Sequence, residues 1–324
     1  MEPIISIILT SYNKPYYIMK SIKSVLNQTE KNWELFIMDD NSNDETVEVI
    51  NNFLYDKRIH YFNSGIADID RHKTARYATM INQALHLAKG KYISYLTDDT
   101  IYLPNRLAEM MLYFNNNPLS RIVYSSQLIK QVDLSHKVLN QFTRPAKIIL
   151  QDAFFKVDHC SVMHERCLLE PIYKEYHSYW DDNKDYWGYA DSIFWMRLNK
   201  LAPFYPLNKV LDITYKTPIS VQTLFRDLPN TILDGSLVKG TTEDIYFITN
   251  GYRKKISNSL FFFFNYETSD IVSIPDPILL QFPLGEPIDL HLNLPDYLFI
   301  KEAETSRYFY LENNRKREVS TSLL

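Results

Sequence analysis

Two adjacent carboxylates, Asp98 and Asp99, could together bind a divalent metal ion. They follow residues 92–96, which are apolar, aromatic or β-branched as in a buried strand. Open α/β sheets bind ligands beyond the carboxyl ends of their strands. Carboxylate oxygens there suit Mg²⁺ or Mn²⁺, and such an ion usually carries a phosphate. On this segment alone, an Asp-Asp turn that caps the next helix is an equal alternative.

Polar residues also follow two other predicted strands. Thr10 and Tyr12 come after an apolar run over residues 4–9, and Asp40 follows one over residues 34–38. Parallel strands place their carboxyl ends at one edge of a sheet, so these side chains are expected to converge on one crevice. Three converging clusters favour a ligand site over separate turns.

Predicted strands and helices alternate along the first hundred residues. Apolar runs predict strands over residues 4–9, 34–38, 59–62 and 92–96. Amphipathic patterns predict helices from Pro15, from Asn43 or Asp44, and over residues 71–89, 104–116 and 191–201. This alternation is typical of an α/β fold with a mostly parallel central sheet and flanking helices.

The phosphate-binding motifs rich in glycine are missing from the sequence. It contains neither Gly-x-Gly-x-x-Gly nor a P-loop. A phosphate would therefore be held by a metal and by cations, and Arg71, Lys73 and Arg76 precede the acidic strand.

Composition bounds the other classes of function. Hydrophobic residues make up 45% of the 324 residues and charged residues 23%, as in an ordinary globular protein. The net charge of −4 gives no reason to expect nucleic acid as a partner. The sequence shows no signal peptide or transmembrane segment, and Cys160 and Cys167 are expected to be buried thiols of a reducing compartment. We expect a cytoplasmic protein.

Several segments together resemble a known family. They are Ser-Ile-Ile-Leu-Thr-Ser-Tyr-Asn-Lys-Pro, Met-Asp-Asp-Asn-Ser-Asn-Asp-Glu-Thr, Thr-Asp-Asp, and three later ones that begin at Asp158, Ser178 and Phe204. Their order and spacing are similar to those of family 2 glycosyltransferases of GT-A fold. The later segments match most closely the enzymes of spore-coat polysaccharide biosynthesis. The resemblance covers roughly residues 4–216.

The resemblance implies roles for the residues at the first two strand ends. Tyr12 would stack on a pyrimidine base with Thr10 beside it, and Asp40 would accept a hydrogen bond from the ring N–H of the base. Arg71 would contact the diphosphate.

It also implies roles for four aspartates. Asp98 would hold the ribose, and Asp99 would bind the Mg²⁺ or Mn²⁺ that bridges the diphosphate. Asp191 matches the family's catalytic base. Asp158 is a second candidate in the same half.

The pattern of the sequence changes near residue 229, where short predicted strands follow one another. Residues 1–228 are expected to form the transferase domain, with a nucleotide-binding half over 1–100 and an acceptor half over 101–228. Residues 229–290 predict a small β-rich module, with a hairpin turn at Asn250-Gly251, that serves in docking or oligomerisation. Residues 291–324 are charged, and part of this tail is expected to be disordered.

The resemblance predicts an inverting, metal-dependent transferase of cell-surface or spore-coat polysaccharide synthesis. It would move a sugar from a UDP- or dTDP-sugar to a hydroxyl acceptor, a saccharide or a protein. One alternative is a spore-surface scaffold protein that binds sugar nucleotides and turns them over weakly. Another is a sugar-1-phosphate nucleotidyltransferase, although this chain lacks the glycine-rich loop of that class after its first strand.

Overall fold

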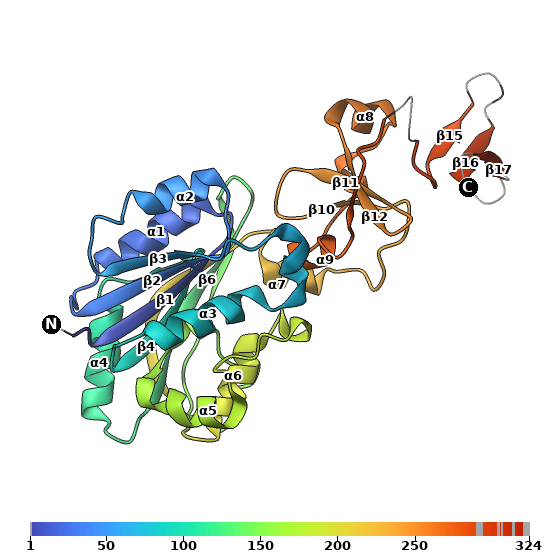
Figure 1. Cartoon of the computed structure of the whole chain (residues 1–324). Coiled ribbons are helices and arrows are strands. Elements are labelled where there is room, and N and C mark those ends of the chain that lie inside the picture. Colours follow the sequence, from blue (N-terminus) through green and yellow to red (C-terminus); the bar gives the residue numbers. More distant parts are fainter. Residues whose placement is uncertain (1, 290–293, 303–304, 306, 313–314, 320–324) are drawn as a thin grey trace. The chain divides into compact units, whose positions relative to one another are not determined.

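The chain divides into two compact units, Met1–Pro218 and Ile219–Leu324, in a computed structural model (Figure 1). The structure describes residues 2–289, 294–302, 305, 307–312 and 315–319. The units divide ahead of residue 228, where the sequence places the domain boundary, and the short helix α7 (Val221–Arg226) falls in the second unit.

The first unit is built on one nine-stranded sheet with the order β3-β2-β1-β4-β8-β6-β9-β5, and β7 pairs with β6. The strands in this sheet are β1 (Ile5–Ser11), β2 (Trp33–Asp39), β3 (Ile59–Asn63), β4 (Tyr92–Thr97), β5 (Thr100–Tyr102), β6 (Ile122–Val132), β7 (Val138–Arg144), β8 (Val162–Glu165) and β9 (Phe204–Lys216). Strands β1 to β4 are parallel, as predicted, but the ladders of β8, β7 and β5 are antiparallel, so the sheet as a whole is mixed.

Helices cover both faces of this sheet (Figure 1). Their bounds are α1 (Pro15–Leu26), α2 (Asp44–Asn51), α3 (Arg76–Leu87), α4 (Arg106–Asn116), α5 (Leu169–Tyr176) and α6 (Ala190–Asn199). Side chains alternate along a strand, so β1 sends Ile7 to the core under α1, α2 and α4, and Ile8 to the core under α3, α5 and α6. The mixed α/β fold with two buried layers agrees with the fold class predicted from the sequence.

One predicted helix begins later than expected. The pattern over residues 71–89 resolves into a 3₁₀ helix, η1 (Asp68–Lys73), an extended Thr74–Ala75 and then α3. Ala75 donates its N–H to the carbonyl of Asp182, which interrupts the helical ladder at this point. Arg71 therefore lies on a separate turn ahead of α3.

A buried ion pair links α4 to β9. The Nη1 of Arg106 lies 3.3 Å from Oδ2 of Asp212, and both side chains are fully buried. Arg106 also donates 2.7 Å to the carbonyl of Cys160. Burial raises the pKa of Asp212 to about 7, against the opposing effect of Arg106. This network fixes the segment that carries Asp158 and His159.

The second unit is β-rich. A five-stranded sheet has the order β13-β10-β11-β12-β14. Its strands are β10 (Leu237–Lys239), β11 (Ile245–Thr249), β12 (Tyr252–Ile256), β13 (Ile271–Ser273) and β14 (Leu284–Gly285), with the helices α8 (Asn258–Phe263) and α9 (Asp276–Leu279). Strands β11 and β12 pair antiparallel around Asn250 and Gly251, which both have positive φ (50° and 74°), so the predicted hairpin is confirmed.

The described part of the tail forms a second small sheet. Strands β15 (Phe299–Lys301), β16 (Tyr308–Glu312) and β17 (Arg315–Val319) pair antiparallel in sequence order. These strands account for part of residues 291–324, and the prediction that part of this tail is disordered stays a prediction, some of which lies outside the described residues. Cys160 is buried as expected, whereas Cys167 is exposed. No helix in the described part of the chain is long and apolar enough to cross a membrane.

The Arg106 network yields a stability prediction. Arg106→Met should lower the free energy of unfolding by about 3–5 kcal/mol, because the Asp212 carboxylate loses its buried cation. Loss of Arg106 also raises the pKa of Asp212 further above its value in the unfolded chain. The folded variant then retains a proton that the unfolded chain releases, so the variant's stability falls as pH rises toward the new pKa. Urea unfolding from about pH 6 to about pH 8 should show the deficit growing above neutral pH by up to about 1.4 kcal/mol per unit.

Lys209→Met is the matched control. Lys209 pairs with Glu109 at 2.7 Å, but its side chain is 55% exposed. Losing this pair should change stability by about 0–1 kcal/mol with little pH dependence. An Arg106→Met variant no less stable than this control at either pH would contradict the role given to the buried pair.

Candidate active site

The ends of β1, β2 and β4 meet at one edge of the sheet. Thr10 is in register with Thr97, and its carbonyl accepts a hydrogen bond from the N–H of Asp98 at 3.1 Å. The N–H of Tyr12 donates 2.9 Å to Oδ2 of Asp98. The N–H of Asp40 donates 2.9 Å to the carbonyl of Ser11. The three polar clusters that the sequence predicts are therefore brought together.

Asp98 and Asp99 share one cation, Lys14. The Nζ of Lys14 lies 2.9 Å from Oδ1 of Asp98 and 2.9 Å from Oδ2 of Asp99. Thr97 donates its hydroxyl to Oδ1 of Asp99 at 2.7 Å. Both carboxylates are buried, with residue exposures of 5% and 7%. Burial opposes ionisation of Asp99, but Lys14 and Lys216 outweigh it and lower the pKa of Asp99.

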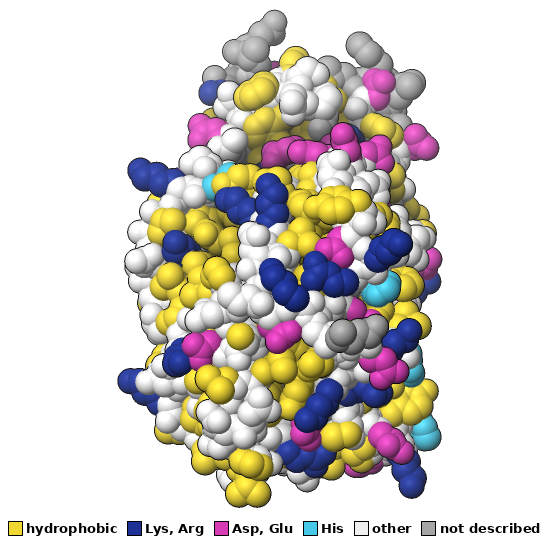
Figure 2. Space-filling model, turned by 90° about the vertical axis from the view of Figure 1, so that its left-hand side faces the viewer, with side chains coloured by type: hydrophobic (Ala, Val, Ile, Leu, Met, Phe, Trp, Pro, Cys, Tyr) yellow, Lys and Arg dark blue, Asp and Glu magenta, His cyan; other side chains and the backbone are white. Residues whose placement is uncertain are grey.

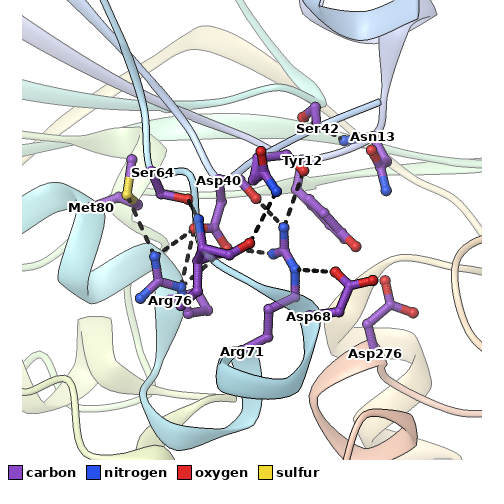
Figure 3. Close-up of polar contacts among 12 residues, drawn as sticks. Tyr12, Asn13, Asp40, Ser42, Ser64, Asp68, Arg71, Arg76, Met80 and Asp276 are labelled. Atoms are coloured by element: carbon purple, nitrogen blue, oxygen red, sulfur yellow. Dashed lines mark hydrogen bonds and ion pairs between the residues drawn. The ribbon is translucent and has the colours of Figure 1, made fainter. Parts of the chain in front are cut away.

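Asp40 is held by two arginines (Figure 3). Arg71 donates from Nη1 to Oδ2 of Asp40 at 2.7 Å, and Arg76 donates from Nη2 to Oδ1 at 2.7 Å. All three side chains are buried. Arg71 also donates to the carbonyls of Asp40 and Asn41. These contacts fix the guanidinium of Arg71 at the end of β2.

Arg71 lies over the ring of Tyr12, with its guanidinium carbon 4.1 Å from the ring centroid. The resemblance implies that this ring stacks on a base and that Arg71 contacts a diphosphate. In this structure Arg71 lies against Tyr12 and Asp40. A buried carboxylate needs positive partners, which accounts for both arginines beside Asp40.

Residues 101–218 of the first unit contribute a second acidic group. Asp158 lies 3.5 Å from Nη1 of Arg144 and accepts the N–H of Cys160 at 3.1 Å. Burial opposes ionisation of Asp158, but Lys216, His159 and Arg144 outweigh it and lower its pKa. Lys216 thus lowers the pKa of both Asp99 and Asp158. The N–H of Tyr215, the residue before it, donates 2.9 Å to the carbonyl of Asp99, so β9 brings Lys216 to the end of β4.

Asp191 is in the first turn of α6 and faces a histidine. Its Oδ2 lies 3.7 Å from Nδ1 of His159, and its Oδ1 accepts the N–H of Ser192 at 2.8 Å. Burial alone would lower the pKa of His159, but Cys160 and Asp191 beside it raise the pKa well above its usual value. The Nε2 of His159 is buried without a hydrogen-bond partner among the described residues. Asp191 therefore has its carboxylate beside an imidazole whose pKa is raised.

The sequence missed some of the cations that neutralise this site. Lys14, Lys216 and His159 are not among the site residues that the sequence predicts. Lys73, predicted as a phosphate ligand, is exposed and pairs with Asp70. The sequence does contain a signal for Lys14. This lysine follows the first predicted strand two residues after Tyr12, and the carboxyl end of that strand is expected to lie beside Asp98 and Asp99.

Charges of both signs are interspersed on the face shown in Figure 2, and neither sign forms a continuous surface there. This mixture of charges fits a chain whose net charge is −4.

Curated proteins similar to this chain include several bacterial sequences. The chain is 48% identical to Protein CgeD of Bacillus subtilis over 315 residues, which cover 97% of this chain and 72% of CgeD. It is 31% identical over 184 residues to WfgD of Escherichia coli, named a UDP-Glc:alpha-D-GlcNAc-diphosphoundecaprenol beta-1,3-glucosyltransferase, which covers 55% of this chain and 68% of WfgD. The similarity to CgeD extends through most of the second unit.

Solved structures show the same fold. The complex of Staphylococcus aureus TarS 1–349 with UDP superposes with a TM-score of 0.51 at 16% identity, over 67% of this chain and 61% of that chain. The complex of the same protein with UDP-GlcNAc gives 0.50. Residues 6–170 match the family model for glycosyl transferase family 2. The fold, the convergent strand ends and this match together show that the chain belongs to glycosyl transferase family 2 and is a glycosyltransferase.

Proposed function

We propose that the chain transfers a sugar from a pyrimidine nucleotide diphospho-sugar to a hydroxyl acceptor with inversion at the anomeric carbon. The observation that carries the proposal is the meeting of Tyr12, Asp40, Asp98 and Asp99 at one sheet edge, with Asp191 in the adjoining half. Family membership removes the nucleotidyltransferase alternative. Measuring the rate of sugar transfer distinguishes this proposal from the alternative of a scaffold protein that binds sugar nucleotides and turns them over weakly.

A uridine donor is favoured over a thymidine donor. The solved relatives bind UDP and UDP-GlcNAc, and WfgD is named for UDP-Glc. Tyr12 offers a ring face and Asp40 a carboxylate at neighbouring strand ends. Arg71 lies against the Tyr12 ring and is anchored to the carbonyls of Asp40 and Asn41, so it would contact the diphosphate from this position.

The residues at the end of β4 fit a divalent ion that is completed by the nucleotide. No three His, Cys, Asp or Glu side chains form a metal-ligand group within the part of the chain that the structure describes. Asp99, with Asp98 beside it, supplies carboxylate oxygens, and Mg²⁺ or Mn²⁺ is commonly held by one or two carboxylates plus substrate phosphates. When bound, the ion would stabilise negative charge on the leaving diphosphate.

Asp191 is the proposed general base. Its carboxylate would take the proton of the acceptor hydroxyl, whose oxygen attacks the anomeric carbon opposite the diphosphate and inverts it. The imidazole of His159 and the N–H of Ser192 hold that carboxylate in one orientation. Asp158, held by Arg144, would orient the acceptor.

We propose the class of the acceptor and the role of the second unit from the sequence resemblance. The segments shared with enzymes of spore-coat polysaccharide synthesis favour a saccharide acceptor, with a protein as the alternative. The second unit contains no residue of the proposed site, so a role in docking or oligomerisation is the function we propose for it.

Nucleotide selectivity tests the base pocket. UDP and dTDP should raise the melting temperature more than ADP or GDP, and binding at a hundredfold excess over Kd adds about 2.7 kcal/mol of stability. Tyr12→Ala should weaken UDP binding by about 1–3 kcal/mol through lost stacking. Tyr55→Ala, which removes a tyrosine that is 77% exposed, should leave UDP binding unchanged. Equal shifts with ADP would refute the pyrimidine assignment.

Metal dependence tests Asp99. Asp99→Asn should lower turnover by at least about a hundredfold, since it removes a ligand of the charge-stabilising ion. Asp70→Asn, at a partly exposed carboxylate paired with Lys73, should retain turnover. Donor hydrolysis and transfer are measured with added Mn²⁺ and with EDTA. Full activity in EDTA would show that cationic side chains alone stabilise the leaving group.

The base assignment separates Asp191 from Asp158. Asp191→Asn should lower kcat by about 10²–10⁴ and leave UDP binding intact, because it removes only the proton acceptor. Asp158→Asn should mainly raise the KM for the acceptor, and the exposed Asp185→Asn should change neither constant. A loss of kcat in Asp158→Asn together with a raised acceptor KM in Asp191→Asn would show that the two residues have the opposite roles.

A further inference from the structure

We propose that Lys14 is an internal counter-ion that occupies the cation position between Asp98 and Asp99 until the nucleotide arrives, and so makes divalent-ion binding depend on the diphosphate. The inference rests on the proposed function and adds to it a residue and an order of binding. Lys14 acts as a positioning residue.

The geometry puts the ammonium where an ion bound by both carboxylates would lie. Nζ is 2.9 Å from one oxygen of Asp98 and 2.9 Å from one oxygen of Asp99. Mg²⁺ binds oxygen at about 2.0–2.1 Å and so needs the same oxygens at closer range. The ammonium and the ion cannot both occupy this position.

Charge explains why the nucleotide is needed. Two carboxylates and one ammonium leave a single negative charge in a largely buried site. Adding a divalent ion while Lys14 stays would leave a net positive charge there, with Lys216 also nearby. A nucleoside diphosphate brings new anionic oxygens that can accept the ammonium of Lys14 while the ion takes the carboxylates.

Lys14 is able to make this exchange. It is the residue before α1, and its side chain is 23% exposed. Among the described residues, its ammonium donates hydrogen bonds only to Asp98 and Asp99. Arg71, by contrast, is also anchored to main-chain carbonyls. The long flexible stem of a lysine lets its ammonium relocate without a change in the backbone.

The test is the affinity for Mn²⁺, measured by electron paramagnetic resonance and calorimetry on the full chain with and without UDP. Without UDP, Lys14→Met should bind Mn²⁺ about tenfold more tightly than the wild type, because the competing cation is gone. UDP should strengthen Mn²⁺ binding strongly in the wild type and much less in Lys14→Met. Lys20→Met, which removes a charge from α1 at a lysine that contacts the Tyr16 ring, should behave as the wild type.

Lys14→Arg covers the case in which Lys14→Met does not fold. Arginine retains the charge and can bind both carboxylates, so Mn²⁺ should bind it no more tightly than the wild type without UDP. Equal Mn²⁺ affinities of nucleotide-free wild type and Lys14→Met would overturn the proposal, as would tighter binding by Lys14→Arg. Binding of UDP is measured separately, with and without Mn²⁺. Failure to bind under both conditions would refute the proposed donor, whereas the comparison of Mn²⁺ affinities without nucleotide still tests the role of Lys14.

Discussion

Carboxylates buried at one edge of a sheet need positive partners, and this constraint shapes the first unit. Asp40, Asp98 and Asp99 end strands whose main-chain ladders fix them out of water, where an unpaired charge is strongly unfavourable. Arg71 and Lys14 supply charge from a 3₁₀ turn and from the residue before α1, respectively. The segments that carry these cations must therefore lie at the same edge of the sheet. Their positive charges offset those of the buried carboxylates, so the folded site is stable without a ligand.

Much of the fold could be predicted because hydrophobic periodicity reports burial directly. The strands β1 to β4 and the turn at Asn250 follow from local pattern and turn chemistry. The break at Ala75 could not be predicted, because it depends on a hydrogen bond to Asp182, more than a hundred residues away in the sequence. The antiparallel ladders of the second half have the same cause, since pairing partners are set by tertiary contacts.

The site was predictable in its acidic positions and less so in its cations. Aspartates at strand ends stand out in a sequence, because few other residues there can bind a metal or a base. A lysine such as Lys14 looks like any solvated residue until the fold shows what its ammonium contacts. The pairing of His159 with Asp191 likewise joins positions more than thirty residues apart, which no local spacing reveals.

The continuity of the nine-stranded sheet has a consequence for how a turnover cycle proceeds. The two proposed halves, residues 1–100 and the rest of the first unit, share one hydrogen-bonded sheet. The tip of the β6–β7 hairpin contacts α1 through His136, whose ring stacks on Tyr16 with the ring centroids 3.9 Å apart. Hinge opening between the halves would break ladder bonds and this aromatic contact. We therefore expect substrates to enter and products to leave through movements of loops and single side chains. These movements are local and of small amplitude, in contrast to a hinge motion of whole halves.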